Sequence, residues 1–133
     1  MEHIKITDLC VGDWVMYDLK PYIVQQIDGE SEHVVISGSE GVREKHIDYI
    51  EPICIKPEML ERNGFVKESR AYKWSDEKYR VFVWLKKFSH FVDVVEMNKQ
   101  FATRNSCIEV KKLHIHQLQH ALRLAGVDKE IEL

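Results

Sequence analysis

Short apolar runs that alternate with polar residues fill the first fifty residues, and this pattern constrains the fold more than any other feature of the chain. Turn-forming residues separate the runs, which is typical of small antiparallel sheets. The pattern predicts five short strands, at residues 13–17, 22–27, 33–36, 42–45 and 49–51, with a tight single turn at 46–48. Five short strands in about fifty residues predict a small closed β-barrel.

The second half of the chain predicts an antiparallel sheet that is covered by a helix. Four strands are expected as a meander, with a polar loop over 98–105, and they cover residues 71–74, 79–85, 91–97 and 106–110. Apolar residues recur at helical spacing over 115–125, and Gly126 follows as a helix stop. We expect this helix to cover the apolar face of the sheet.

Two further elements are expected in this half. Pro57 is well placed as the first residue of a short helix over 57–63, which Gly64 ends. The apolar residues Val127, Ile131 and Leu133 predict a final strand.

The predicted organisation is an α+β fold in two parts that pack together. An N-terminal barrel occupies residues 1–52, and a helix-covered sheet occupies residues 53–133. The first part carries four basic and eleven acidic side chains, a net charge of −7, whereas the second carries fifteen basic and eleven acidic side chains, a net charge of +4. Charges of opposite sign favour contact between the two parts.

Composition places the chain among folded cytoplasmic proteins. Apolar residues make up 44% of the sequence, which is enough to build a core. No apolar run approaches the roughly 18 residues of a membrane-spanning helix, and the first residues do not resemble a signal peptide. The three cysteines are widely spaced with no Cys-x-x-Cys pair, so we expect buried free thiols.

Two resemblances add to this picture. Residues 11–15, followed by Val24 and Ile27, resemble the opening hairpin of SH3-like barrels. The segments 12–15, 50–53, 57–65 and 116–122 together are similar to a family of small uncharacterised proteins encoded by phages, prophages and other mobile elements of gut bacteria. The resemblance implies an accessory protein of such an element in the cytoplasm of a bacterial host.

The sequence departs from that family at two positions. Leu19 stands in the first hairpin turn, where the family more often has Gly, and this predicts a different turn type. Lys56 precedes Pro57 where a Thr or Ser cap is usual, so the short helix lacks a side-chain acceptor, at a cost of about 1 kcal/mol.

A histidine cluster is the densest group of potential metal ligands. His116 and His120 are four residues apart and share one helix face, as two metal ligands require, while His90 and Glu109 are candidates for a third ligand. The competing interpretation is that these histidines cap the helix or bond to the backbone, and we favour it because no metalloprotease signature accompanies them. We expect no metal and no cofactor.

Enzymatic motifs are not evident. Cys10 or Cys107 beside a histidine would be required for nucleophilic catalysis, but both lie in apolar settings where a raised pKa makes a thiol inert. The glycines do not form a phosphate-binding loop, and adjacent carboxylates fall on turns. We therefore expect no enzyme.

Two binding functions remain open. The first is protein binding or self-assembly, through a groove of the barrel lined by Trp14, Tyr17, Tyr22 and Tyr49. The alternative is nucleic-acid binding by a basic sheet face, whose cations are Lys73, Arg80, Lys86, Lys87, Lys111 and Lys112. Alternation places Arg80 on the same face as Phe82 and Trp84, although a core beneath the helix explains these aromatic residues equally well.

Overall fold

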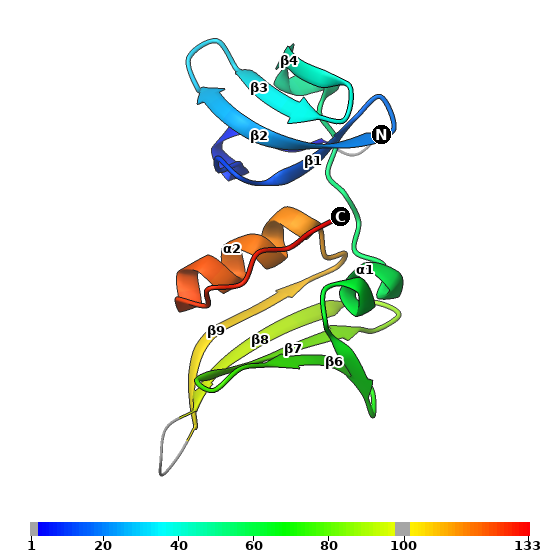
Figure 1. Cartoon of the computed structure of the whole chain (residues 1–133), viewed down its shortest axis with the longest axis vertical. Coiled ribbons are helices and arrows are strands. Elements are labelled where there is room, and N and C mark those ends of the chain that lie inside the picture. The colour runs from blue at the N-terminus through cyan, green and yellow to red at the C-terminus, as the bar shows by residue number, and fades with distance from the viewer. Residues whose placement is uncertain (1–2, 98–101) are drawn as a thin grey trace. The chain divides into compact units, whose positions relative to one another are not determined.

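The computed structural model describes residues 3–97 and 102–133, which form two compact units (Figure 1). The first unit comprises the residues up to Ile53 together with 114–116, and the second comprises 54–113 and 117–133. Strands predominate, in two antiparallel sheets, so the fold is mostly β and the predicted α+β class is wrong. No helix among the described residues is long and apolar enough to span a membrane.

The first unit holds a four-stranded sheet in the order β1-β2-β3-β4. Its strands are β1 (Trp14–Tyr17), β2 (Lys20–Asp28), β3 (His33–Gly38) and β4 (Gly41–His46). Alternation directs every second side chain inward, where Val15, Tyr22, Val24, Val34 and Ile36 join one apolar core. Four of the five predicted strands are thereby confirmed.

The first sheet does not close into a barrel, so that part of the fold prediction is wrong. The tight turn expected at 46–48 is present as a 3₁₀ turn (Ile47–Tyr49). The fifth strand expected at 49–51 does not form, and that segment contributes one bridge, between Glu51 and Met16. Each of these two residues donates its backbone N–H to the carbonyl of the other, at 2.8 and 2.9 Å. After this bridge the chain leaves β1, and the carbonyl of Ile53 accepts a hydrogen bond from the Ile115 N–H at 2.8 Å instead.

The second unit holds a five-stranded sheet in the order β5-β6-β7-β8-β9, where four strands were predicted. Its strands are β5 (Val66–Glu68), β6 (Ala71–Ser75), β7 (Tyr79–Leu85), β8 (His90–Met97) and β9 (Ala102–Val110). The additional strand, β5, has three exposed residues and no apolar alternation, so it gives no signal in the sequence. In the predicted polar loop, residues 98–101 lie outside the described residues, and β9 begins at Ala102.

One face of the second sheet carries the core of this unit, beneath the helix α2 (Ile115–Ala125) (Figure 1). The buried residues of the sheet include Tyr72, Tyr79, Val81, Val83, Val92 and Val94, and those of the helix include Leu118, Ala121, Leu122 and Ala125. The helix ends as predicted, because Gly126 has a φ of +81° and the N–H of Val127 donates to the Leu122 carbonyl at 2.9 Å. The predicted covering helix is confirmed.

The short helix α1 (Pro57–Arg62) is also confirmed, with no side-chain hydrogen bond from Lys56 at its start. The predicted final strand is wrong. Val127 and Ile131 are buried as their apolar character requires, but no strand forms there. Instead, the Asn63 side chain accepts from the N–H of Glu132 at 2.7 Å and donates to its carbonyl at 2.8 Å. A side chain thus provides hydrogen bonds that a neighbouring strand would otherwise supply.

Candidate functional site

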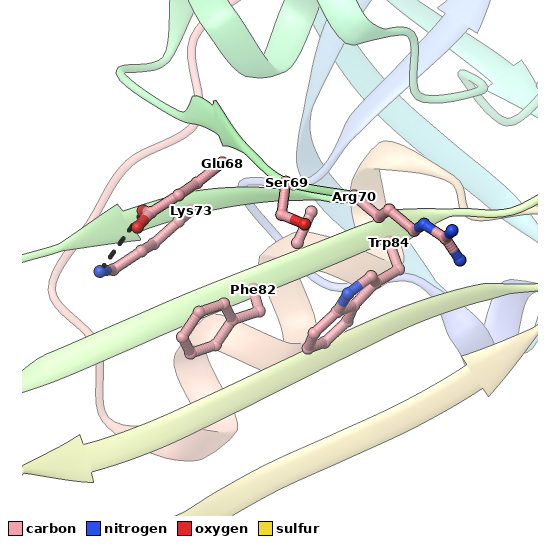
Figure 2. A pocket seen from close by; sticks show the side chains of 7 residues that line it. Glu68, Ser69, Arg70, Lys73, Phe82 and Trp84 are labelled. Atoms are coloured by element: carbon pink, nitrogen blue, oxygen red, sulfur yellow. Dashed lines mark ion pairs between the residues drawn. The ribbon is translucent and has the colours of Figure 1, made fainter.

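The face of the second sheet that lies opposite α2 carries an aromatic surface. Because side chains alternate along β7, Val81 and Val83 are buried under the helix while Phe82 and Trp84 project to the other side (Figure 2). The two outward rings are stacked, with centroids 5.5 Å apart and planes inclined by 20°. The register places Phe91 of β8 directly opposite Trp84. We call Phe82, Trp84 and Phe91 the aromatic platform.

Two open hollows flank Trp84 on this face. The first has a volume of about 460 Å³ and is lined by Glu68, Ser69, Arg70, Ala71, Lys73, Phe82 and Trp84 (Figure 2). The second has a volume of about 350 Å³ and is lined by Trp84, Lys86, Phe91, Asp93, Arg104 and Cys107. Since Trp84 borders both hollows, they are adjacent sites along one surface.

Cations surround the aromatic platform. In the first hollow, Lys73 pairs with Glu68 at 3.6 Å, and three quarters of the lysine side chain is buried. In the second, the ammonium group of Lys86 lies 5.0 Å from the centroid of the Phe91 ring, within the range of a cation–π interaction. Arg104 forms an ion pair with Asp93 at 3.0 Å. Apolar rings bordered by charged groups can bind a ligand that combines flat rings with anionic groups.

The structure brings together three of the six cations that were predicted to bind nucleic acid. Lys73, Arg80 and Lys86 lie on or beside the outward face, and Arg80 shares that face with Phe82 and Trp84 as alternation predicted. Lys87 is placed over Phe88 in the turn after β7 instead, and Lys111 and Lys112 are exposed beyond the end of β9. These three lysines line neither hollow.

Sequence reasoning missed Arg70, Phe91 and Arg104. Phe91 follows the same alternation as Trp84, and pairing the two strands by their valines would have placed the two rings together. Arg104 was assigned to a loop, but it lies on β9 opposite Val95, beside a bulge between Val94 and Val95. A bulge changes which residues share a face, and a single sequence gives no signal for it.

The aromatic residues predicted to line a groove of the first unit lie in different environments. Tyr22 is only 2% exposed, and Tyr17 packs edge-on against it with ring centroids 5.8 Å apart. Tyr22 is therefore part of the core and does not line a surface groove. Trp14 is half-buried and pairs with Ile23 on the opposite side of β1 from Val15, whereas Tyr49 is 64% exposed.

The predicted metal ligands do not form one site. On the paired strands β8 and β9, His90 lies opposite Val110, and the next residue, Phe91, lies opposite Glu109. Because successive residues of a strand point to opposite sides, His90 and Glu109 face opposite sides of the second sheet. The Nδ1 atom of His90 accepts a hydrogen bond from the Leu113 N–H at 2.8 Å, and partial burial lowers the pKa of this histidine, with a smaller contribution from Lys112. On α2, His116 is buried and stacks on His114, while His120 is half-buried one turn further along.

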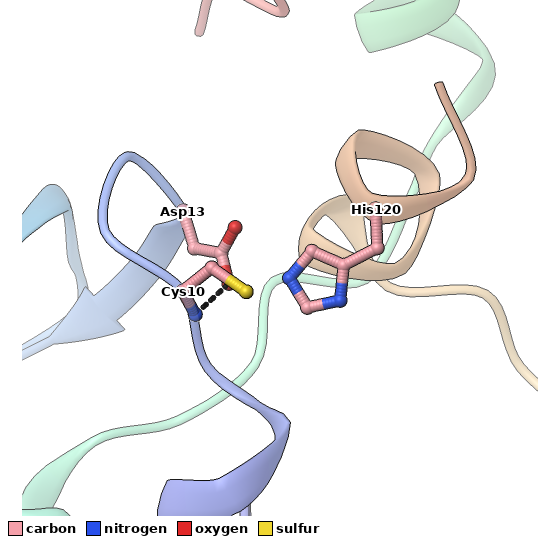
Figure 3. Close-up of side chains that lie close together, drawn as sticks. All are labelled: Cys10, Asp13 and His120. Atoms are coloured by element: carbon pink, nitrogen blue, oxygen red, sulfur yellow. Dashed lines mark hydrogen bonds between the residues drawn. The ribbon is translucent and has the colours of Figure 1, made fainter. Parts of the chain in front are cut away.

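The prediction of buried thiols is wrong for two of the three cysteines. Cys10 and Cys107 are exposed, and Cys54 is half-buried. Cys107 is exposed because its register, opposite Asp93, directs it to the outward face of β9. Cys10 lies in a turn, where its backbone N–H donates to the Asp13 carboxylate at 2.7 Å (Figure 3). Asp13 is fully buried, so this aspartate stabilises the turn that leads into β1.

Comparison with known proteins gives no relative. Family models, curated proteins and solved structures all fail to match this chain.

Proposed function

We propose that the second unit binds single-stranded nucleic acid on the outward face of its sheet, as a non-enzymatic accessory module. The observation that carries this proposal is the aromatic platform, in which three rings occupy the side of the sheet that α2 leaves uncovered. The proposed function corresponds to the alternative from the sequence rather than to the groove of the first unit, because Tyr22 of that groove is buried.

The physical case begins with the position of the rings. Aromatic side chains stabilise a domain when they are buried, and Tyr72 and Tyr79 are buried on the core side of the sheet. Phe82 and Trp84 are on the other side and remain partly exposed, so they contribute less to folding than buried rings of the same size. Exposed rings of this kind are suited to stacking with bases, at about 1–3 kcal/mol per base.

The surrounding charges support a polyanionic ligand. Lys73 and Lys86 line the two hollows beside the platform, Arg80 lies on the same face of β7, and residues 53–133 have a net charge of +4. Residues 1–52 have a net charge of −7 and repel a polyanion, which restricts the expected contact to the second unit. Stacking requires unpaired bases, so a single strand suits this surface better than a duplex.

The cellular setting is a second part of the proposal. The resemblance to small proteins of phages and mobile elements supports a role in the cytoplasm of a bacterial host. The free thiols of Cys10 and Cys107 are compatible with a reducing compartment.

The test is fluorescence anisotropy of a short labelled oligonucleotide, at about 50 mM and about 200 mM salt. We expect binding that weakens as salt rises, and a loss of roughly tenfold in affinity for Trp84→Ala because one stacking partner is removed. Tyr49→Ala is the matched control, since it removes an exposed ring of the first unit and should leave affinity unchanged.

Two results would contradict the proposal. One is the absence of binding to any single-stranded RNA or DNA at low salt. The other is an equal loss of affinity for Trp84→Ala and Tyr49→Ala. A dimer detected by light scattering that is insensitive to salt and is disrupted by Trp84→Ala would assign the platform to protein contact instead.

A further inference from the structure

We propose that the second hollow selects guanine over the other bases, through Arg104 held in place by Asp93. This inference rests on the proposed function, because it concerns which base of a bound strand enters one of the two hollows.

The Arg104–Asp93 pair has a fixed geometry. The Nε atom of Arg104 lies 3.0 Å from one carboxylate oxygen of Asp93, and an Nη2 hydrogen is donated to the other oxygen at 3.2 Å. The Asp93 side chain is only 13% exposed, whereas the Arg104 side chain is 65% exposed. A largely buried carboxylate on β8 therefore orients an exposed guanidinium group on β9 through one hydrogen bond, from Nη2, and one close ion-pair contact, from Nε.

This pairing uses one edge of the guanidinium group and leaves its end available. The edge that faces Asp93 carries Nε and one hydrogen of Nη2, so Nη1 and the second hydrogen of Nη2 at the end of the group can act as two parallel donors. Arg104 lines the second hollow together with Trp84 and Phe91. An arginine with a fixed orientation beside aromatic rings can contact the edge of a stacked base.

The two donors match guanine better than any other base. Guanine presents two adjacent acceptors, O6 and N7, and a paired contact from arginine to these atoms is the commonest specific contact to this base. Adenine presents an amino donor beside N7, which opposes an arginine donor, and pyrimidines have no second acceptor at that position. A phosphate group could also accept both donors, and in that case Arg104 would give no base preference.

Base analogues in anisotropy measurements distinguish these cases. The probe is a short uridine-rich oligonucleotide with one central position varied among guanine, adenine, inosine and 7-deazaguanine. We expect guanine and inosine to bind about tenfold more tightly than adenine, because both present O6 and N7. We expect 7-deazaguanine to lose most of this advantage, because it lacks N7.

Three variants assign the preference to Arg104. Arg104→Lys keeps the positive charge and should retain both the affinity for the uridine strand and its salt dependence, but the preference for guanine should be lost. Asp93→Asn keeps the size of the side chain and should reduce the preference, because the orienting charge is removed. Arg80→Ala is the matched control: it removes an exposed charge from the same face, so overall affinity should fall and the preference should persist.

Three other results would contradict either the guanine preference or the proposed function. Tight binding with equal affinity for guanine and adenine would refute the base preference and leave the proposed function standing, with Arg104 assigned to phosphate. A preference that survives Arg104→Lys would place the reading of guanine elsewhere. No binding of any strand would refute the proposed function, and this inference with it.

Discussion

The two units use their aromatic residues in opposite ways. In the first unit, Tyr22 lies in the core and Tyr17 packs against it. In the second, Tyr72 and Tyr79 are buried on the core side of the sheet, but Phe82 and Trp84 occupy the uncovered side of the same sheet. Both sheets are antiparallel and both bury one face, so the fold itself does not require rings on an open face. The additional rings are the feature on which the proposed binding of a strand rests.

The two units also differ in net charge. The first is acidic and the second is basic, with net charges of −7 and +4 for residues 1–52 and 53–133. The polyanion of the proposed function would therefore meet attraction and stacking partners on the same part of the chain.

The sharpest test of this comparison removes one ring from each side of β7 and compares the loss of stability. Tyr79→Ala should destabilise the second unit by about 3–5 kcal/mol, because it removes a buried ring on the core side of the sheet. Phe82→Ala should cost much less, because Phe82 lies on the uncovered side. Chemical denaturation measures both values, and similar losses for the two variants would show that the platform is part of the core.

A glycine in the first unit tests how tightly its aromatic core is packed. A Cβ atom on Gly38 would lie 2.7 Å from Cδ2 of Tyr22 and 3.0 Å from the Pro21 carbonyl oxygen. Gly38→Ala should therefore destabilise the unit by about 1–3 kcal/mol. Gly29→Ala is the control, because a Cβ there meets no atom within 4 Å. Equal stability of the two variants in denaturation would contradict close packing around Tyr22.

The first hairpin offers a substitution that should stabilise the protein, by a smaller amount. Asp18 and Leu19 both have positive φ, at 50° and 63°, in the two-residue turn between Tyr17 and Lys20. This geometry suits Gly at the second position, and Leu19 is 87% exposed, so its side chain adds little packing. Leu19→Gly should stabilise the first unit by about 1 kcal/mol in thermal or chemical denaturation. Leu19→Ala keeps the strain, and an equal gain from that variant would exclude this explanation.

The smallest expected effect is a pH dependence of the second unit. The pKa of His90 is lowered in the folded state, chiefly by burial, so the unfolded chain binds more protons below the ordinary pKa of 6.5. Stability should fall as pH decreases from 6.5 through the lowered pKa, since protonation also removes the acceptor for the Leu113 N–H. His90→Gln keeps an acceptor without titrating. Denaturation at about pH 7.5 and 5.5 should show a smaller decrease for this variant, and an unchanged decrease would assign the effect to other groups.

The sequence predicted the elements that have a strong local signal. The helix over 115–125 and its end at Gly126 follow from apolar spacing and a left-handed stop, and both are as expected. The strand β5 was missed because its residues are exposed, and the barrel does not close because the segment after β4 pairs with β1 through the single bridge of Glu51. Such features depend on partners that are distant in the sequence.

The candidate site was predictable to a similar extent. Alternation correctly placed Arg80, Phe82 and Trp84 on one face. It did not decide whether that face lies under the helix, because both faces of β7 are apolar. The contribution of Arg104 required the bulge in β9, where the pairing passes over Asn105, from Ser106 opposite Val94 to Arg104 opposite Val95.

The exposed thiol of Cys107 gives the second hollow a chemical reporter of its own. Its sulfur lies on the outward face, in a hollow that Trp84 and Arg104 also line. The thiol lies beside the proposed position of a base, so a bound base would shield it from an alkylating reagent. The rate at which Cys107 is labelled would therefore report whether the second hollow is occupied. Cys10 is exposed as well, and replacing it with Ser would leave Cys107 as the more accessible of the two remaining thiols.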